Sequence, residues 1–183
     1  SSVTASGSGA TKTITITSSE FTTDSDNNLV AGVGAFEGTG TRNIALGYGA
    51  LDDGTTAEHS VAIGFQSLFV ATTGSYNTAV GYQTLLRCTT GEYNADYGYL
   101  PMQQVTTGKH NVGIGSYALN AATTGWNNVG IGREAGRNIT TGNGNICIGL
   151  FAEASSATTN YEVTIGNSSI TKFRVPGLNF ELT

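Results

Sequence analysis

Residues 127–136, NNVGIGREAG, contain the kind of glycine-rich phrase that cradles phosphate in nucleotide-binding loops. Such a loop uses its glycines once, opens a helix and carries a Lys followed by Ser or Thr. Here no Gly-Lys-Ser/Thr sequence follows, and similar phrases recur along most of the chain. The glycines are therefore expected to serve a repeating structure rather than a nucleotide.

The repeat interval is 17 residues. The glycine column consists of Gly47, Gly64, Gly81, Gly98, Gly115, Gly132, Gly149 and Gly166. The residue before each glycine is mostly aliphatic: Leu46, Ile63, Val80, Tyr97, Ile114, Ile131, Ile148 and Ile165. Four places after the glycine comes a second apolar column: Leu51, Leu68, Leu85, Met102 and Leu119. Asparagine predominates four places before the glycine, and a Thr-Thr pair occurs in six consecutive units. Eight copies in phase indicate a repeat architecture.

A 17-residue unit is too short for a helical pair or a propeller blade, but it suits one coil of a β-solenoid. Residues i and i+17 would then stack about 4.8 Å apart. We expect an all-β, repetitive β-solenoid or β-roll in which the Ile/Val and Leu columns point inward. The Asn column would form amide ladders, and Thr-Thr-Gly would make a corner. Glycine would recur because each coil needs a positive φ or a close backbone approach at that place.

The repeat defines three regions. Residues 28–170 should form about nine coils of short parallel strands. Residues 1–27 form an N-terminal connector with one strand in the alternating stretch TKTITIT, 11–17, and a polar turn at 24–28. Residues 171–183 are expected to be an exit strand that leads to further sequence.

Composition excludes several functions. The net charge is −5 and only 11% of residues are charged, which argues against a nucleic-acid partner. No apolar run approaches the roughly 18 residues that a membrane helix needs, so membrane insertion is not expected. The only cysteines, Cys88 and Cys147, lie in different columns, so both are expected to be free and packed. The sequence suggests no cofactor.

The predicted core is thin, because only two large apolar columns fill it. A chain of this kind gains little from burial alone. We therefore expect the coils to pack against copies of themselves in a parallel homotrimer, which would bury a second face. The preferred arrangement has each chain coil on itself, and the alternative interleaves three chains.

The units HSVAIGFQSL, NTAVGYQTLL and HNVGIGSYAL resemble the head repeats of trimeric autotransporter adhesins, and still more the repeat shafts of bacteriophage tail fibres. The stretch YEVTIGNSSITKFRVPGLNF is similar to the exit segment of tail fibres from phages of cyanobacteria. The resemblance covers about residues 28–170 and implies a trimeric fibre. Its expected place is the virion, outside the cell, and its expected partners are other fibre or tail proteins and a host surface saccharide.

Four aromatic residues are candidates for glycan binding. Trp126 stands in a column that otherwise holds polar residues, so its indole is expected to face solvent and to stack on a sugar ring or to contact a neighbouring chain. Tyr82 and Tyr99 belong to an aromatic column that either packs or presents a glycan-stacking face. Tyr117 lies in the adjoining coil region. The irregular unit NADYGYLPM, 94–102, is interpreted as a local bulge in preference to a recognition spot.

No catalytic or metal-binding set is recognisable, and the chain is not expected to be an enzyme. Asp52 and Asp53 are adjacent and therefore splayed, while His59 and His110 lie three coils apart, too far to share an ion within one chain. Two alternatives to the fibre segment remain open. One is a glycan-cleaving tailspike module with carboxylates assembled across subunits. The other is an ice-binding β-solenoid, suggested by the Thr-Thr pairs.

Overall fold

The computed structural model describes residues 3–6, 13–16, 23–54 and 56–172, and these residues contain strands and turns but no helix. Strands β1 (Val3–Ser6) and β2 (Thr13–Ile16) form an antiparallel pair. The predicted strand in 11–17 is thus present at its centre. Residues 173–183, which hold most of the predicted exit strand, lie outside the described part of the chain.

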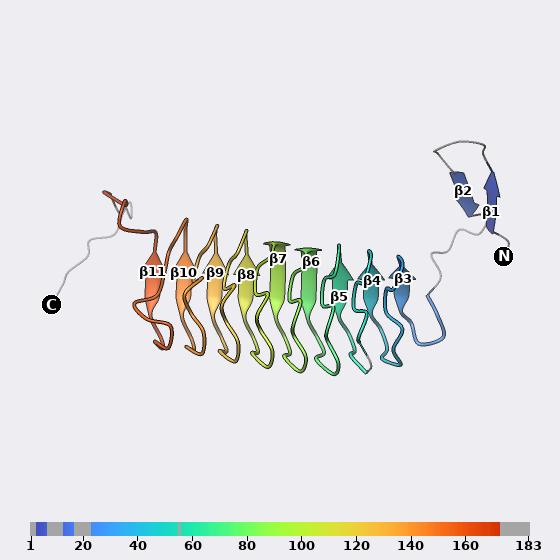
Figure 1. Ribbon diagram of the computed structural model, residues 1–183, viewed down its shortest axis with the longest axis horizontal. Coiled ribbons are helices and arrows are strands. Elements are labelled where there is room, and N and C mark those ends of the chain that lie inside the picture. Colours follow the sequence, from blue (N-terminus) through green and yellow to red (C-terminus); the bar gives the residue numbers. More distant parts are fainter. Residues whose placement is uncertain (1–2, 7–12, 17–22, 55, 173–183) are drawn as a thin grey trace, which may run out of the picture.

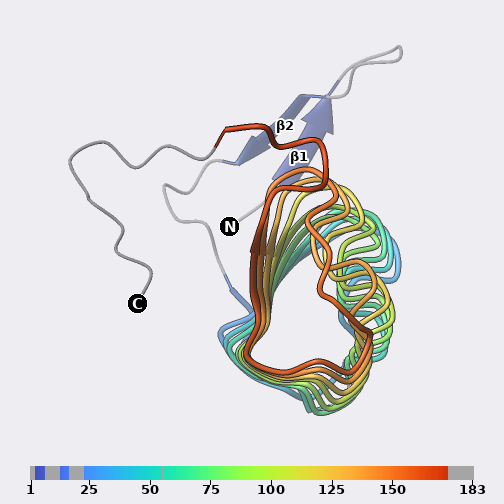
Figure 2. The ribbon, with the colours of Figure 1, turned by 90° about the vertical axis from the view of Figure 1, so that its left-hand side faces the viewer.

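The other nine strands form one parallel sheet in sequence order (Figure 1). They are β3 (Leu29–Ala31), β4 (Ile44–Leu46), β5 (Val61–Ile63), β6 (Thr78–Tyr82), β7 (Ala95–Tyr99), β8 (Val112–Ile114), β9 (Val129–Ile131), β10 (Ile146–Ile148) and β11 (Val163–Ile165). From β4 onward each residue pairs with the residue 17 positions later. Along the axis the successive coils superpose, with the strands in one wall (Figure 2). The predicted solenoid of 17-residue coils is confirmed, with about eight turns in a single chain.

The glycine column combines a positive φ with a close approach to the backbone of the next coil, the two reasons for which glycine was expected there. Gly115 has a φ of +122°, where residues with a Cβ are strained. A Cβ on Gly115 would also lie 2.8 Å from the carbonyl carbon and oxygen of Gly132 in the next coil. Each coil therefore turns and touches its neighbour at the same place, and only glycine permits both.

The predicted direction of the Ile/Val column is wrong. The side chains immediately before the glycines are half-buried or exposed, and Ile114 and Ile148 retain 39% and 38% of their accessible surface. Successive side chains on a strand point to opposite faces, so the residues one place earlier face inward instead. These are mostly small: Ala45, Ala62, Ala79, Asp96, Gly113, Gly130 and Cys147, all buried. The interior beside the sheet is narrow and admits only small side chains, which leaves the large aliphatic residues outside.

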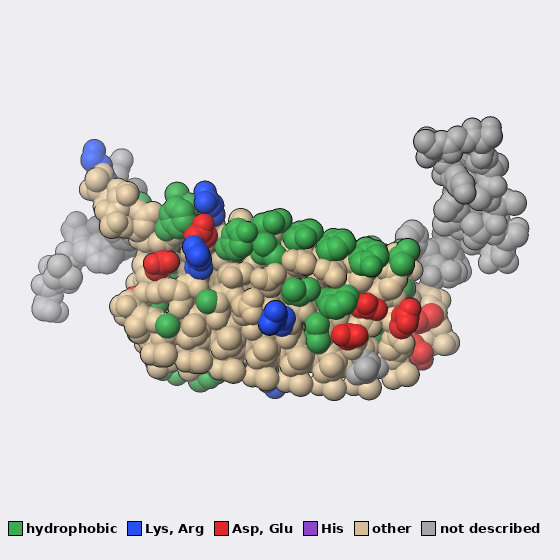
Figure 3. All heavy atoms as spheres, viewed as in Figure 1, with side chains coloured by type: hydrophobic (Ala, Val, Ile, Leu, Met, Phe, Trp, Pro, Cys, Tyr) green, Lys and Arg blue, Asp and Glu red, His purple; other side chains and the backbone are tan. Residues whose placement is uncertain are grey.

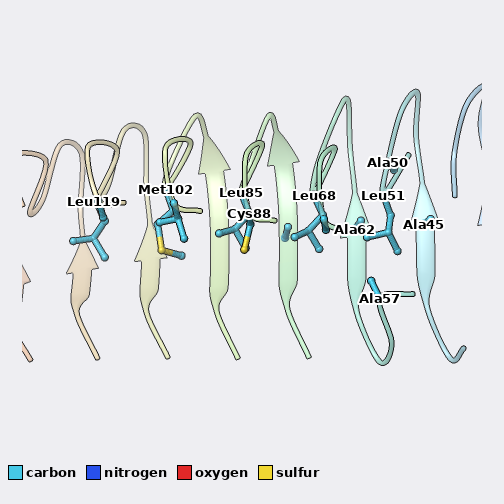
Figure 4. Packing of buried hydrophobic residues seen from close by; sticks show 14 of the residues in the cluster. Ala45, Ala50, Leu51, Ala57, Ala62, Leu68, Leu85, Cys88, Met102 and Leu119 are labelled. Carbon is cyan, nitrogen blue, oxygen red and sulfur yellow. The ribbon is translucent and has the colours of Figure 1, made fainter. Parts of the chain in front are cut away.

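The Leu column does fill the core (Figure 4). A second column of inward side chains lies three residues after the Leu column. Its side chains change in size where those of the Leu column change. Where the leucine is replaced by Gly136, the second column supplies Ile139 in place of Ala122. The side chains of Leu119 and Ile139 then occupy the space that a Cβ on Gly136 would take, at 2.7 and 3.3 Å from that position. The packed volume is kept although its source changes, as close-packed interiors require.

The predicted asparagine ladder is also present and is fully buried. The Asn111 side chain donates to Asn94 Oδ1 at 3.1 Å and to the Gly125 carbonyl at 2.9 Å. Its own Oδ1 accepts from the backbone N–H and the side-chain amide of Asn128, at 2.9 and 3.2 Å. The Asn111 amide thus ties three coils together and satisfies polar backbone groups inside the solenoid, and Asn94 and Asn128 bond in the same way.

The unit at 94–102 is not a bulge. Strand β7 pairs in continuous register with β6 and β8. The irregularity lies inside the coil, where the Asp96 carboxyl is completely buried. Asp96 Oδ2 accepts the Leu85 backbone N–H at 3.1 Å. A burial of this kind also removes Asp96 from any external recognition spot.

The Thr-Thr-Gly segments form the predicted corners. From the pair at Thr72 onward, the first threonine binds the next coil through its hydroxyl, as when Thr106 Oγ1 donates to the Thr123 carbonyl at 3.3 Å. The second threonine is exposed in all six pairs. The polar turn at 24–28 is present too, because Asp24 Oδ1 accepts the backbone N–H groups of Asp26 and Asn28.

Candidate binding surface

An aromatic ladder follows the residues after the glycine column. Tyr48, Phe65, Tyr82 and Tyr99 stack nearly parallel with ring centroids 5.2–5.3 Å apart. Tyr117 meets Tyr99 edge-on at 5.7 Å. A row of hydrophobic side chains runs along the edge toward which the strands point (Figures 1 and 3), where residues following the glycines lie. The structure therefore brings three of the four candidate residues together: Tyr82, Tyr99 and Tyr117.

Stacking decides what this first ladder can offer to a ligand. The faces of the Phe65 and Tyr82 rings are covered by their neighbours, and Tyr99 is covered by Tyr82 on one side and approached by Tyr117 on the other. Sugar rings pack against the flat face of an aromatic ring, not against its edge. The ladder presents mainly ring edges, so its geometry favours the packing interpretation of this column.

A second ladder was missed by the sequence analysis. His59, Tyr76, Tyr93 and His110 stack with centroids 4.9 Å apart and interplanar angles of 2–9°. The signal was available, because these residues stand 17 positions apart directly before the asparagine column. The two histidines are separated by two tyrosine rings, which agrees with the expectation that they share no ion within one chain.

Trp126 belongs to a different edge of the coil, just after a Thr-Thr-Gly corner. Its side chain is exposed, as predicted, and retains 42% of its accessible surface. It borders a hollow of about 360 Å³ whose other walls are Thr107, Lys109, His110 and Thr124. The Lys109 ammonium is held by the Glu92 carboxylate at 2.9 Å. His110 is the last ring of the second ladder, so the hollow lies where that ladder ends.

Tyr117 lines a separate hollow of about 260 Å³ with Asn120, Glu134 and Arg137. The Glu134 carboxylate is largely buried and pairs with Arg137 at 2.6 Å and with Arg133 at 3.3 Å. The structure thus does not bring Trp126 and Tyr117 into one site. Within this hollow the charge of Arg137 is therefore paired with the Glu134 carboxylate.

The outer face of the parallel sheet carries an exposed apolar column. It carries the Ile/Val column that was expected inside. Exposed members of this column are Tyr97, Ile114, Ile131, Ile148 and Ile165. A contiguous row of exposed apolar side chains is typical of an interaction site.

Acidic and metal-binding groups are sparse. No group of three or more His, Cys, Asp or Glu residues that could hold a metal is found among the described residues. Burial raises the pKa of Asp52, and the charges of Asp53 and Glu37 add to the effect.

No helix in the described part of the chain is long and apolar enough to span a membrane.

Comparisons with known protein families, with curated proteins and with solved structures gave no match to this chain.

Proposed function

We propose that this chain is a structural and adhesive segment of a homotrimeric viral tail fibre that attaches the virion to its host cell. The proposal combines the rod of stacked coils with the resemblance of its repeats to tail-fibre shafts. A solenoid propagates one cross-section along an axis, which is the geometry that a rigid extracellular spacer requires.

The observation that carries the trimer is the apolar outer face of the sheet. In a single chain, Ile114, Ile131 and Ile148 stay more than one-third exposed although they form a straight column along the sheet. Burial of apolar area contributes roughly 25 cal/mol per Å², so association through this face is favourable. Three chains packed around a common axis would cover it in every copy, in keeping with closed cyclic symmetry.

The test is the mass of the native assembly by light scattering at micromolar concentration. A mass three times that of the 18.8 kDa chain is expected. Purified trimer should also compete with virions for host cells in an adsorption assay. A monomeric mass would contradict the trimer, and a trimer that leaves adsorption unchanged would reduce the segment to a passive shaft.

A further inference from the structure

The hollow beside Trp126 combines one flat aromatic wall with several polar groups. Trp126 and Lys109 come from successive coils of one column, and Thr124 and Thr107 come from successive coils of another. The hollow therefore spans two coils on the outer surface. Its volume of about 360 Å³ accommodates one pyranose ring with its hydroxyls but not a large planar cofactor.

The backbone on the far side of Trp126 is fixed. The backbone N–H of Trp126 donates to Asn143 Oδ1 at 3.0 Å, and the side-chain amide of Asn143 in turn donates to Asn160 Oδ1 at 3.1 Å. These bonds hold the corner from the C-terminal side, whereas the hollow opens on the Lys109 side. The indole is therefore carried on a supported backbone, which lowers the cost of ordering a binding site.

Trp126 also belongs to neither aromatic ladder. The rings of the two ladders cover one another, but the position 17 residues after His110 is Asn127, which provides no ring. Among the described residues, the Trp126 indole stacks on no other aromatic ring. An apolar sugar face can therefore lie on it.

The charges of the hollow decide which sugar fits. Lys109 is the ammonium group of the lining, and the Glu92 carboxylate already neutralises it at 2.9 Å. An acidic sugar would have to displace or approach Glu92, whereas the hydroxyls of a neutral sugar can bond to both threonines and to the imidazole without disturbing the ion pair. The lining thus favours a neutral ligand.

We propose that the hollow formed by Thr107, Lys109, His110, Thr124 and Trp126 is a subsite for one neutral hexopyranose unit of a surface saccharide. This inference rests on the proposed function and assigns its ligand class. One shallow subsite binds weakly, in the millimolar range, and its repetition in a trimer raises the avidity through effective concentration.

Trp126 is the only tryptophan of the chain, so its fluorescence reports this subsite directly. The probes are the methyl glycosides of glucose, galactose and mannose, with glucuronate as the acidic counterpart. At least one neutral glycoside should give a saturable change in Trp126 emission, and glucuronate should bind more weakly. The proposal is overturned if none of the neutral glycosides gives a saturable response, or if glucuronate binds more tightly than they do.

Two variants localise the ligand. Thr124→Val should weaken binding about 2- to 10-fold through loss of one hydrogen bond. Thr141→Val is the matched control: it is an exposed threonine of the same column one coil further on, outside the hollow, and it should bind as the parent does. Equal weakening in both variants, or in neither, contradicts the assignment.

Failure of this subsite is distinguishable from failure of the proposed function. A trimer that blocks virion adsorption but gives no Trp126 response overturns the subsite and leaves the attachment function. A saturable Trp126 response in a protein that never blocks adsorption supports the subsite and contradicts host attachment through this segment.

Discussion

The Leu85 backbone N–H donates to Asp96 Oδ2 at 3.1 Å, inside the solenoid. In neighbouring coils the backbone N–H at the equivalent position donates to a backbone carbonyl of the next coil. The Met102 N–H, for example, donates to the Ala118 carbonyl at 2.9 Å. For Leu85 the corresponding carbonyl would belong to Pro101. The Pro101 carbonyl does not accept the Leu85 N–H, and the Asp96 carboxyl takes its place as the acceptor in this coil.

The buried carboxyl makes stability depend on pH. Burial raises the pKa of Asp96 well above its ordinary value, although the Leu85 N–H lowers it in part. Because the folded-state pKa lies above the unfolded value of about 3.9, stability from this group is full below that pH and falls as pH rises toward the folded-state pKa. Asp96→Asn keeps an acceptor and removes the charge, so it should stabilise the protein by about 1–3 kcal/mol at neutral pH.

The measurement is the difference in free energy of unfolding between Asp96→Asn and the parent, at several pH values from 3 to 8. The difference cancels the carboxyls shared by both proteins, including Asp24 and Glu162, whose pKa values are lowered by hydrogen bonds. It should grow with pH above about 4. A difference that stays constant or shrinks would show that Asp96 is not held protonated.

Substitution in the glycine column should be severe. Gly115→Val combines a positive φ with a close approach of the new Cβ to the Gly132 carbonyl. A loss of about 2–4 kcal/mol per chain is expected from strain and overpacking together. Thermal melting of this variant is compared with that of Ser116→Val, the adjacent position in the same coil. If both variants melt alike, the glycine requirement is wrong.

The asparagine ladder predicts a similar loss by another mechanism. Asn111→Ala removes two donated and two accepted hydrogen bonds and leaves the Asn128 N–H buried without that acceptor. The expected loss is about 2–4 kcal/mol in free energy of unfolding, because buried polar groups are left unsatisfied. Thr107→Ala changes an exposed corner of the same coil, and its free energy of unfolding should differ from that of the parent by no more than about 0.5 kcal/mol. Comparable losses in the two variants would contradict a structural ladder.

The two cysteines should be inert until the solenoid opens. Both are free and buried. Burial raises the pKa of Cys88 to about 12 and that of Cys147 to about 11, so the reactive thiolate is scarce at pH 8. A thiol reagent such as dithionitrobenzoate should react with neither in the native protein and with both in denaturant. Rapid native reaction at Cys88 would show that the coils around it open easily.

The sequence predicted the solenoid because a strict interval of 17 leaves little freedom in how coils stack. The direction of the Ile/Val column was less accessible, since a short strand alternates and either set can face inward. The deciding signal was that Ala45, Ala62 and Ala79 are uniformly small, as a narrow interior requires. The hollow at Trp126 could not be predicted, because it depends on how side chains from two coils lean toward each other.

The outer face of the sheet gives the sharpest test of assembly. Ile131 is 36% exposed in the single chain and is the last residue of β9, within the apolar column. Ile131→Lys places an ammonium in the proposed interface but leaves the solenoid interior untouched, so the mass should fall to that of a monomer while the β-type circular dichroism spectrum is kept. Thr141→Lys adds the same charge at an exposed corner and should leave the trimer intact. If Ile131→Lys assembles as the parent does, the chains do not meet through this face.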